Sequence, residues 1–424
     1  MSDHILDPSG KGKGAISGLK DVAILVGIPS YNNARTIGHV VRAVEAGLTK
    51  YFPGRRSVLV NSDGGSSDGT TEIVEKASAD LDSILLDHRK GGFHKLVTPY
   101  QGIPGKGSAF RKIFEIARDL EAQACAVVDS DLRSITPEWI ELLIKPILEE
   151  RYEYVAPSYM RHKYDGTITN TIVYPLTRAL YGKRIRQPIG GDFGFSGRLA
   201  SLFLDKDVWE SDVARFGIDV WMTTTALANG FEICQAFLGA KIHDAKDPGA
   251  DLSAMLHQVV GSVFDLMEEY AGIWRAVTGS EPVATFGFPY SVGLEPIRVD
   301  LERMIGMFRL GVKELESFYG SFLPKDVLES LVDLAARTEA GRFAYPDRLW
   351  VRTVMSFSLA CHRKVASREH IIKSLTPLYL GKVASFVVET WDSSAEEVET
   401  RLEELCLAFE RDKSYLIDAW GEPA

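Results

Sequence analysis

The fold is decided by a short stretch that reads Cys125-Ala126-Val127-Val128-Asp129-Ser130-Asp131. Its apolar residues predict a buried strand, and two carboxylates follow directly where that strand ends. Other apolar runs predict strands at 22–28, where Pro29 is expected to end the strand, and at 57–60, 84–86 and 154–157.

Apolar residues at helical spacing alternate with these strands, over 36–51, around 74–77 and over 105–117. Alternating strands and helices predict an α/β protein with a mostly parallel sheet that helices cover. Ligands of such sheets bind at the carboxyl ends of the strands. From about Ser253 onward the pattern is helical, and Ser394 with Glu397 predicts a capping box at the start of one helix.

The composition excludes several classes of protein. The chain has 424 residues, of which 45% are hydrophobic and 25% charged, as in ordinary globular proteins. Its formal net charge of −10 argues against a general nucleic-acid or anionic-membrane binder. The four cysteines form no CxxC pair, so we expect buried free thiols and no zinc site. Without a signal-peptide pattern or 18 consecutive apolar residues, we expect a cytoplasmic protein that does not span a membrane.

Asp129 and Asp131 are the first candidate functional residues. Two carboxylates separated by one residue at a strand end can converge on a divalent cation and on the phosphates that it binds. Mg²⁺ and Mn²⁺ prefer such oxygen ligands and keep positions open for substrate oxygens. The pattern therefore suggests a phosphate-binding metal site, although an acidic turn without function has the same short sequence.

Three polar turns fall at other predicted strand ends, at 29–33, 63–68 and 104–107. The Asp63 carboxylate could accept a hydrogen bond from a base or a ribose hydroxyl. Lys106 lies between two glycines that permit a close approach of the backbone, and it could meet a phosphate. Each turn taken alone also fits an ordinary strand-to-helix connection with an exposed polar tip.

The order of the motifs PSYNN (29–33), SDGGSSDGT (62–70), PGKGSAF (104–110) and VVDSD (127–131) resembles the nucleotide-sugar-binding half of GT-A glycosyltransferases. The later segments 187–192, 216–219 and 241–244 resemble the glucosyl-3-phosphoglycerate synthase group, glycosyltransferase family 81. The resemblance spans roughly residues 21–265. It implies a GT-A fold, a hexosyltransferase activity and a Mg²⁺ or Mn²⁺ cofactor.

The resemblance also implies roles for individual residues. Asp131 and His243 would ligate the metal ion, and Asp192 and Asp219 would position the sugar or the acceptor as the catalytic carboxylates. Thr169 would bind the acceptor, and we expect Arg161 and Lys163 to bind it in place of an arginine that the family has and this chain lacks. The donor would be bound by Pro29, Ser30, Tyr31, Asn33, Asp63, Gly64, Lys106, Asp129, Ser130, Gly190 and Gly191.

The chain departs from the family pattern in ways that bear on its substrates. Asn33 and Asp192 stand where the family has Glu, and the family's acceptor-binding Arg is absent two residues before Thr169. Asp244 and Ala245 replace a second basic contact after His243. Two interpretations stay open: basic residues elsewhere, among them His162 and Arg178, hold an acceptor phosphate, or the acceptor is unphosphorylated glycerate.

The implied reaction is retaining transfer of glucose from an NDP-glucose, such as UDP-glucose, to glycerate or 3-phosphoglycerate, which yields a compatible solute or its precursor. The alternatives are mannosyl transfer, a polyprenyl-phosphate or polysaccharide glycosyltransferase, a nucleotidyltransferase and an inactive binding module. We expect a flexible N-terminus at 1–20 and a GT-A domain at 21–270, with a donor half at 21–135 and an acceptor half at 136–270. A helical region at 271–424, with apolar stripes, suggests a homodimer.

Overall fold

The computed structural model describes residues 22–77, 93–100, 102–242, 253–289, 297, 299–336 and 343–421. The chain forms two compact units, each built from separate segments. The first unit comprises Met1–Met160, Ile185–Asp244 and Val283–Gly293, and the second comprises Arg161–Arg184, Ala245–Pro282 and Leu294–Ala424. The boundaries expected at residues 20, 135 and 270, between the N-terminus, the donor half, the acceptor half and the helical region, stay predictions.

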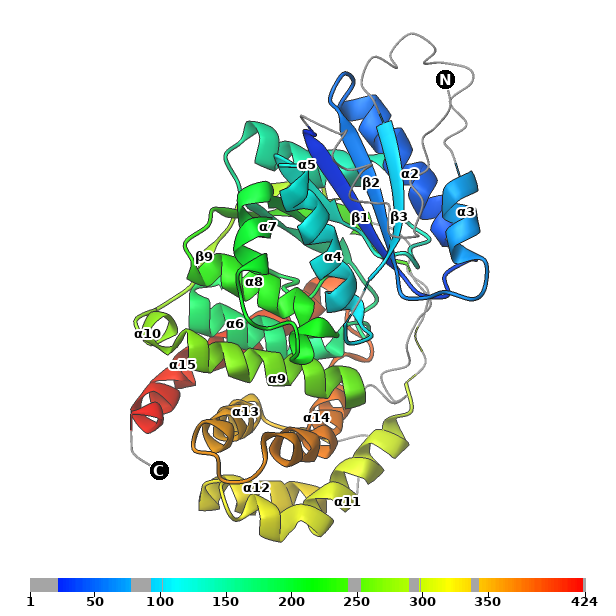
Figure 1. The fold of residues 1–424 in the computed structure, drawn as a ribbon. Helices are drawn as coiled ribbons and strands as arrows, with labels where there is room; N and C mark the ends of the chain where they lie inside the picture. The colour runs from blue at the N-terminus through cyan, green and yellow to red at the C-terminus, as the bar shows by residue number, and fades with distance from the viewer. Residues whose placement is uncertain are drawn as a thin grey trace. The chain divides into compact units, whose positions relative to one another are not determined.

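The first unit contains a mostly parallel sheet, in the order β10-β8-β5-β7-β4-β1-β2-β3 (Figure 1). Every neighbouring pair is parallel except those that β7 makes with β4 and β5. The strands of this sheet are β1 (Ile24–Ser30), β2 (Ser57–Asp63), β3 (Phe93–Pro99), β4 (Ala124–Val127), β5 (Tyr154–Met160), β7 (Phe193–Ser196), β8 (Ile233–Ala240) and β10 (Thr285–Phe286).

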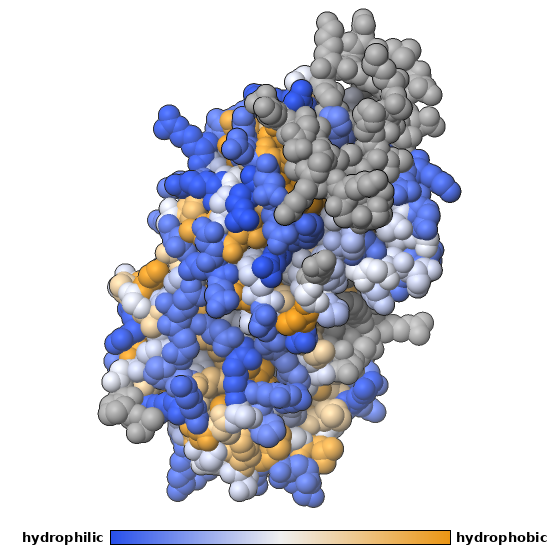
Figure 2. Space-filling model, viewed as in Figure 1, coloured by the Kyte–Doolittle hydropathy of each residue, from blue (hydrophilic) through white to orange (hydrophobic). Residues whose placement is uncertain are grey.

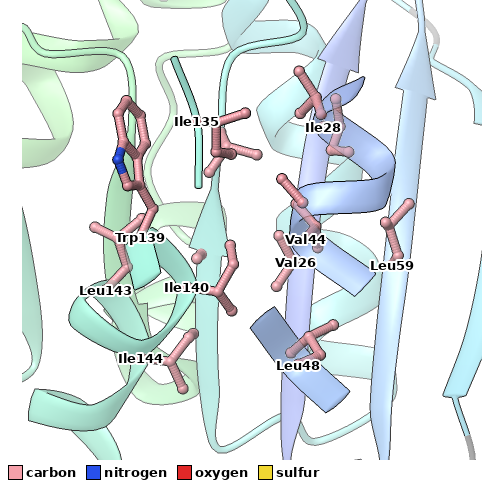
Figure 3. Close-up of a cluster of buried hydrophobic side chains, with 14 of the residues drawn as sticks. Val26, Ile28, Val44, Leu48, Leu59, Ile135, Trp139, Ile140, Leu143 and Ile144 are labelled. Atoms are coloured by element: carbon pink, nitrogen blue, oxygen red, sulfur yellow. The ribbon is translucent and has the colours of Figure 1, made fainter. Parts of the chain in front are cut away.

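Helices cover both faces of this sheet because its central strands are apolar on both sides. On one face α2 (Ile37–Tyr51) packs on β1 and β2, and α5 (Pro137–Glu149) packs on β4, β5, β7 and β8. Figure 3 shows side chains of both helices in this core. On the other face lies α4 (Lys106–Asp119), whose Ile113 is so close to Gly27 that an added Cβ would lie 2.6 Å from it. Further helices of this unit are α3 (Thr70–Lys76), α7 (Gly197–Leu204), η2 (Asp212–Ala214) and α8 (Ile218–Ala228).

An aromatic cluster completes the α4 face. The Phe114 ring of α4 lies 5.2 Å from Phe195 of β7 and 5.4 Å from Phe203 of α7, between ring centroids. The Phe203 ring in turn lies 5.0 Å from Trp221 of α8. These contacts join four elements around one buried core and leave the polar strand ends outside it.

The predicted α/β class with added C-terminal helices is confirmed, and four of the predicted strands are present as β1, β2, β4 and β5. The expectation that Pro29 ends the first strand is wrong, since β1 continues to Ser30. The ladder with β4 ends at Gly27, so the missing N–H of Pro29 costs no hydrogen bond there. The predicted strand at 84–86 lies outside the described residues, and the sequence reasoning missed β3.

In the residues that the structure describes, the second unit is helical apart from one two-stranded sheet, β6 (Lys183–Arg184) with β9 (Glu281–Pro282). The predicted capping box of Ser394 and Glu397 is confirmed at the start of its last helix. Its helices are η1 (Thr169–Val173, a π-helix), α6 (Tyr174–Tyr181), α9 (Ser253–Glu269), α10 (Ala271–Trp274), α11 (Leu301–Tyr319), α12 (Lys325–Ala336), α13 (Asp347–His362), α14 (Arg368–Thr390) and α15 (Ala395–Trp420).

Helix α14 lies in the core of this second unit. Among the described residues it is the one helix whose length and composition would allow it to cross a membrane. However, 72% of its most apolar 18-residue stretch is buried within the structure. Its Gly381 lies so close to Phe308 of α11 that an added Cβ would overlap the Phe308 ring. The face in Figure 2 is mostly hydrophilic, and exposed large apolar side chains include Met307 and Leu310 of α11.

Asp347 is the centre of a partly buried ion-pair network in the second unit. Its Oδ1 accepts hydrogen bonds from Lys382 Nζ at 2.7 Å and Arg401 Nη2 at 2.6 Å, and its Oδ2 accepts one from Arg401 Nη1 at 2.7 Å. Burial opposes the charge of this carboxylate, but the two cations outweigh burial and lower the pKa of Asp347. The carboxylate thereby links α13, α14 and α15.

Because the pKa of Asp347 is lower in the folded chain than its ordinary value of 3.8, its ionisation favours folding above that pH. This contribution is lost as the pH falls through 3.8 and below. Asp347→Asn should therefore be less stable at neutral pH, by about 3–5 kcal/mol, because Lys382 is left buried without its anion. Urea unfolding from pH 6 to pH 3 should show a shallower loss of stability for the variant, and parallel curves would contradict this role.

Candidate active site

The turn that follows β2 is shaped by the Asp63 carboxylate. Its Oδ1 accepts hydrogen bonds from the backbone N–H of Gly65 at 2.9 Å and Ser66 at 2.7 Å. Its Oδ2 accepts from the hydroxyls of Ser30 at 2.8 Å and Ser66 at 2.7 Å. Asp63 thus joins the ends of β1 and β2, and its expected contact with a nucleoside stays a prediction.

The turn after β1 is tied to the turn after β4. The Asn33 Oδ1 accepts hydrogen bonds from Ser130 Oγ at 2.8 Å and from the Tyr31 N–H at 2.9 Å. The Thr36 hydroxyl donates to the Ser130 carbonyl at 2.8 Å. Asn33, which stands where the resembled family has Glu, therefore holds the two turns together.

Tyr31 leaves its ring exposed at this edge, with 62% of its surface accessible. Beside it, Gly64 donates its N–H to the Ser30 carbonyl at 2.8 Å. A Cβ on Gly64 would lie 3.0 Å from Tyr100 Oη and 3.2 Å from Tyr31 Cδ2. An exposed aromatic ring next to a crowded glycine offers a flat surface on which a planar ring could stack.

Lys106, the first residue of α4, lies between two carboxylates. Its Nζ is 2.8 Å from Asp129 Oδ1 and 3.2 Å from Asp219 Oδ1, and it donates to the Gly191 carbonyl at 3.4 Å. Its neighbour Gly107 fits only as glycine, because an added Cβ would overlap the Val213 carbonyl. The structure thus brings Lys106 together with Asp219, which is 113 positions away in the chain, and 16% of the Lys106 side chain remains exposed.

Lys241, the residue after β8, occupies the other side of Asp129. Its Nζ donates to Asp129 Oδ2 at 2.7 Å, to Asp192 Oδ2 at 2.8 Å and to the Gly190 carbonyl at 2.8 Å. Asp192 is fully buried, and it also accepts hydrogen bonds from the Tyr159 hydroxyl and, at 2.7 Å, from the Asp129 N–H.

The charges of this cluster follow from burial and pairing. Burial disfavours the charge of Lys106, but Asp129 and Asp219 outweigh burial and raise the pKa of Lys106. Burial likewise works against ionised Asp129, yet Lys106 and Lys241 overcome it and lower its pKa. At Asp219 burial prevails over Lys106 and raises the pKa. Two cations therefore face three acids, and Asp219 is more readily protonated than Asp129.

Gly190 and Gly191 permit the close approach of these groups. A Cβ on Gly190 would overlap the Pro157 ring, and one on Gly191 would overlap Asp129 Oδ2 and lie 2.7 Å from Lys241 Nζ. Gly191 also has a φ of 90°, which side-chain-bearing residues rarely adopt. Both glycines are therefore required by the packing of the cluster.

Asp131, the expected metal ligand, is half-buried two residues beyond Asp129. His243, its expected partner, lies outside the described residues, which contain no group of three His, Cys, Asp or Glu that could hold a metal. Ile242 donates its N–H to Ser134 Oγ at 2.9 Å, and its carbonyl accepts from the Arg133 N–H at 2.9 Å. A single carboxylate suits an ion such as Mg²⁺, which takes much of its coordination from substrate phosphates and water.

Two of the expected acceptor residues, Arg161 and Thr169, belong to the second unit. A Cβ on Gly166 would lie 3.3 Å from Arg161 Nη1 and 3.7 Å from Thr169 Oγ1, so both side chains approach this glycine. Thr169 begins the π-helix η1, a rare turn that is frequent at functional sites. Arg161 also faces the Asp165 carboxylate, with 3.9 Å between Nη1 and Oδ2, so an anion bound here would share the guanidinium with that acid.

Other basic residues of this segment are engaged within the second unit. Lys163 Nζ donates to the carbonyls of Thr390 at 2.6 Å, Trp391 at 2.8 Å and Ser393 at 3.1 Å, and so caps the end of α14. Arg178 is fully buried and donates to Glu403 at 2.5 Å and Glu410 at 2.7 Å.

The sequence reasoning did not single out Lys241 or Tyr159. A lysine at the end of the apolar run of β8 is a signal that could have identified Lys241, since a buried ammonium needs anionic partners. Tyr159 gave no such signal, because a tyrosine in a strand most often serves packing alone.

Comparison with known proteins finds glycosyltransferases, in agreement with the sequence resemblance. Residues 25–209 match the sequence model of glycosyl transferase family 2. Glucosyl-3-phosphoglycerate synthase of Petrotoga mobilis is 26% identical over 272 residues, which cover 59% of this chain and 75% of that protein. Glycosyltransferase AglD of Haloferax volcanii is 26% identical over 137 residues, which cover 32% of this chain and 20% of that protein.

Among solved structures, this chain is similar to glucosyl-3-phosphoglycerate synthase from Mycobacterium tuberculosis in complex with Mg²⁺ and UDP. That match has 22% identity and a TM-score of 0.45, and it covers 62% of this chain and 86% of the other. The family match and the mostly parallel sheet confirm the predicted fold and enzyme class: the chain is a glycosyltransferase with a GT-A type fold and extra C-terminal helices.

Gly191 and Gly230 provide a matched test of the packing in the charge cluster. Both have positive φ, but nothing lies within 4 Å of a Cβ on Gly230. Gly230→Ala should lower the free energy of unfolding by about 1–2 kcal/mol, from backbone strain alone. Gly191→Ala should cost about 1–3 kcal/mol more, because the methyl group overlaps Asp129. Equal losses in urea unfolding would show that the cluster tolerates the extra volume.

Proposed function

We propose that this protein transfers a glucosyl group from a nucleoside-diphosphate glucose to glycerate or 3-phosphoglycerate. The observation that carries the proposal is the cluster of three charged residues: Lys106 at the start of α4, Asp129 just beyond the carboxyl end of β4, and Asp219 in the first turn of α8. Asp131 lies two residues beyond Asp129. The similarity to the Petrotoga mobilis synthase supports this choice of sugar and acceptor. The proposal includes membership of glycosyltransferase family 81.

On this proposal, the turns after β1 and β2 bind the nucleoside and Lys106 binds the diphosphate. Tyr31 supplies an exposed ring for the base, and Asn33 and Asp63 keep the two turns in place. Lys106 keeps its ammonium charged through Asp129 and Asp219. A partly exposed lysine whose ammonium is stabilised in this way is suited to hold the phosphate oxygens of a donor.

Asp131 and His243 would hold a Mg²⁺ or Mn²⁺ ion, which would neutralise the charge that develops on the leaving diphosphate. The bond between the anomeric carbon and the diphosphate oxygen breaks, and the acceptor hydroxyl oxygen bonds to the same face of that carbon. The hydroxyl proton passes to the departing phosphate oxygen, so the configuration is retained and no protein base is needed. Asp219 then serves to position the sugar or acceptor, beside Lys106.

Arg161 and Thr169 are the proposed acceptor ligands. Arg161 takes the place of the arginine that the resembled family has two residues before the threonine. We leave Lys163 and Arg178 out of the acceptor site because helix capping and two glutamates engage them. A homodimer and a cytoplasmic location remain part of the proposal.

The proposal is tested by product formation with Mg²⁺ or Mn²⁺. UDP-, GDP- and ADP-glucose and GDP-mannose are each offered with glycerate and with 3-phosphoglycerate. Asp131→Ala should lower kcat/KM at least about 100-fold, because a charge that stabilises the leaving group is lost. Asp119→Ala, which removes an exposed acid at the end of α4, should leave the rate unchanged. Failure of the wild-type protein to transfer glucose to either acceptor would refute the proposal.

Arg161→Met tests whether the acceptor carries a phosphate. Loss of a charge-assisted hydrogen bond of about 1.5–3 kcal/mol should raise the KM for 3-phosphoglycerate by about 10- to 100-fold. The KM for glycerate should change less, since its carboxylate has a smaller charge. Lys373→Met, a change of an exposed cation on α14, serves as the control. If Arg161→Met leaves both KM values unchanged, Arg161 does not bind the acceptor.

A further inference from the structure

Lys241 is engaged entirely by groups of the protein. An ammonium has three hydrogens, and those of Lys241 go to Asp129 at 2.7 Å, Asp192 at 2.8 Å and the Gly190 carbonyl at 2.8 Å. Only 3% of the side chain is exposed, against 16% for Lys106. Both lysines have partners in the protein, but Lys106 keeps part of its side chain at the surface, whereas Lys241 is enclosed.

Asp192 connects the Lys241 side chain to the backbone at Asp129. Its Oδ2 accepts from Lys241 and from the Tyr159 hydroxyl, and its Oδ1 accepts from the Asp129 N–H at 2.7 Å. This amide lies just beyond the end of β4, where pairing with β7 has stopped at Val127. The backbone at Asp129 is thus held by a buried carboxylate where the ladder between β4 and β7 no longer holds it.

We propose that Lys241 is a positioning residue, which bridges Asp129 and Asp192 and thereby fixes the backbone turn that carries Asp131. The second part of this inference, that the fixed turn favours binding of a metal–nucleoside diphosphate, rests on the proposed function. Groups that orient metal ligands without touching the metal commonly change affinity 10- to 100-fold when they are removed.

The charges of the cluster explain why a cation is needed at this place. Without Lys241, the carboxylates of Asp129 and Asp192 would face each other unbridged, and Lys106 would be the single lysine in contact with the described carboxylates of the cluster. Asp129 would then hold Lys106 more tightly, and Lys106 would be less available to a diphosphate. Both effects weaken donor binding without any contact between Lys241 and the donor.

The first measurement is amide hydrogen exchange over residues 124–131 in the metal-free protein. Lys241→Met, which keeps the length of the side chain and removes its charge, should speed exchange of the Asp129 amide at least about 10-fold. Lys413→Met is the matched control: Lys413 is also a buried lysine, and it donates to the carbonyls of Leu180 and Val277 in the second unit. It should lower the stability but leave exchange at 124–131 unchanged.

The second measurement is the affinity for UDP in the presence of Mn²⁺, by titration calorimetry. The dissociation constant should rise about 10- to 100-fold for Lys241→Met and stay unchanged for Lys413→Met. If Lys241→Met does not fold, Tyr159→Phe replaces it; this variant removes one hydrogen bond to Asp192 and should shift both measurements in the same direction by a smaller factor.

Unchanged exchange at Asp129 would overturn the inference, and weakened UDP binding in that case would assign Lys241 to direct contact with the donor. Faster exchange with unchanged UDP affinity would overturn the link between the fixed turn and the donor. The exchange result does not depend on the reaction. A wild-type protein that makes no glucosylated product would therefore refute the proposed function and leave the positioning role of Lys241 in place.

Discussion

The site depends on the requirement that buried charges be paired. Lys106 and Lys241 lie on opposite sides of Asp129, and the outer partners are Asp219 and Asp192. None of these groups could be this deeply buried alone, because transfer of a single charge out of water costs far more than a folded chain can offset. Their mutual pairing makes the cluster possible, and it also fixes the strand ends that carry the cluster.

Glycines supply the space that this pairing needs. Gly107 and Gly191 approach neighbouring groups so closely that a methyl group would overlap the Val213 carbonyl or Asp129. The sheet brings the strand ends to one edge, and these glycines let the loops between elements close over the lysines. Local backbone freedom and long-range electrostatics thus act on the same few positions.

In the second unit, pairing of charged side chains joins helices to one another. Asp347 with Lys382 and Arg401, and Arg178 with its two glutamates, join helices that are distant in the sequence. In those networks both signs of charge come from the protein, so the networks need no ligand. The cluster of the first unit differs because its Lys106 remains partly exposed, and the proposed function assigns a donor phosphate to this lysine.

The sequence alone determined the alternation of strands and helices, the capping box at Ser394, the place of Asp129 and Asp131 after a strand, and that of Lys106 at the start of a helix, because these follow from local periodicity and turn residues. Only the tertiary structure decided that Lys241 and Tyr159 join them and that Lys163 caps α14. Such contacts link residues between 33 and 230 positions apart, and no local pattern records them. Burial and pairing are properties of the folded chain, and they assign each charged residue its partner.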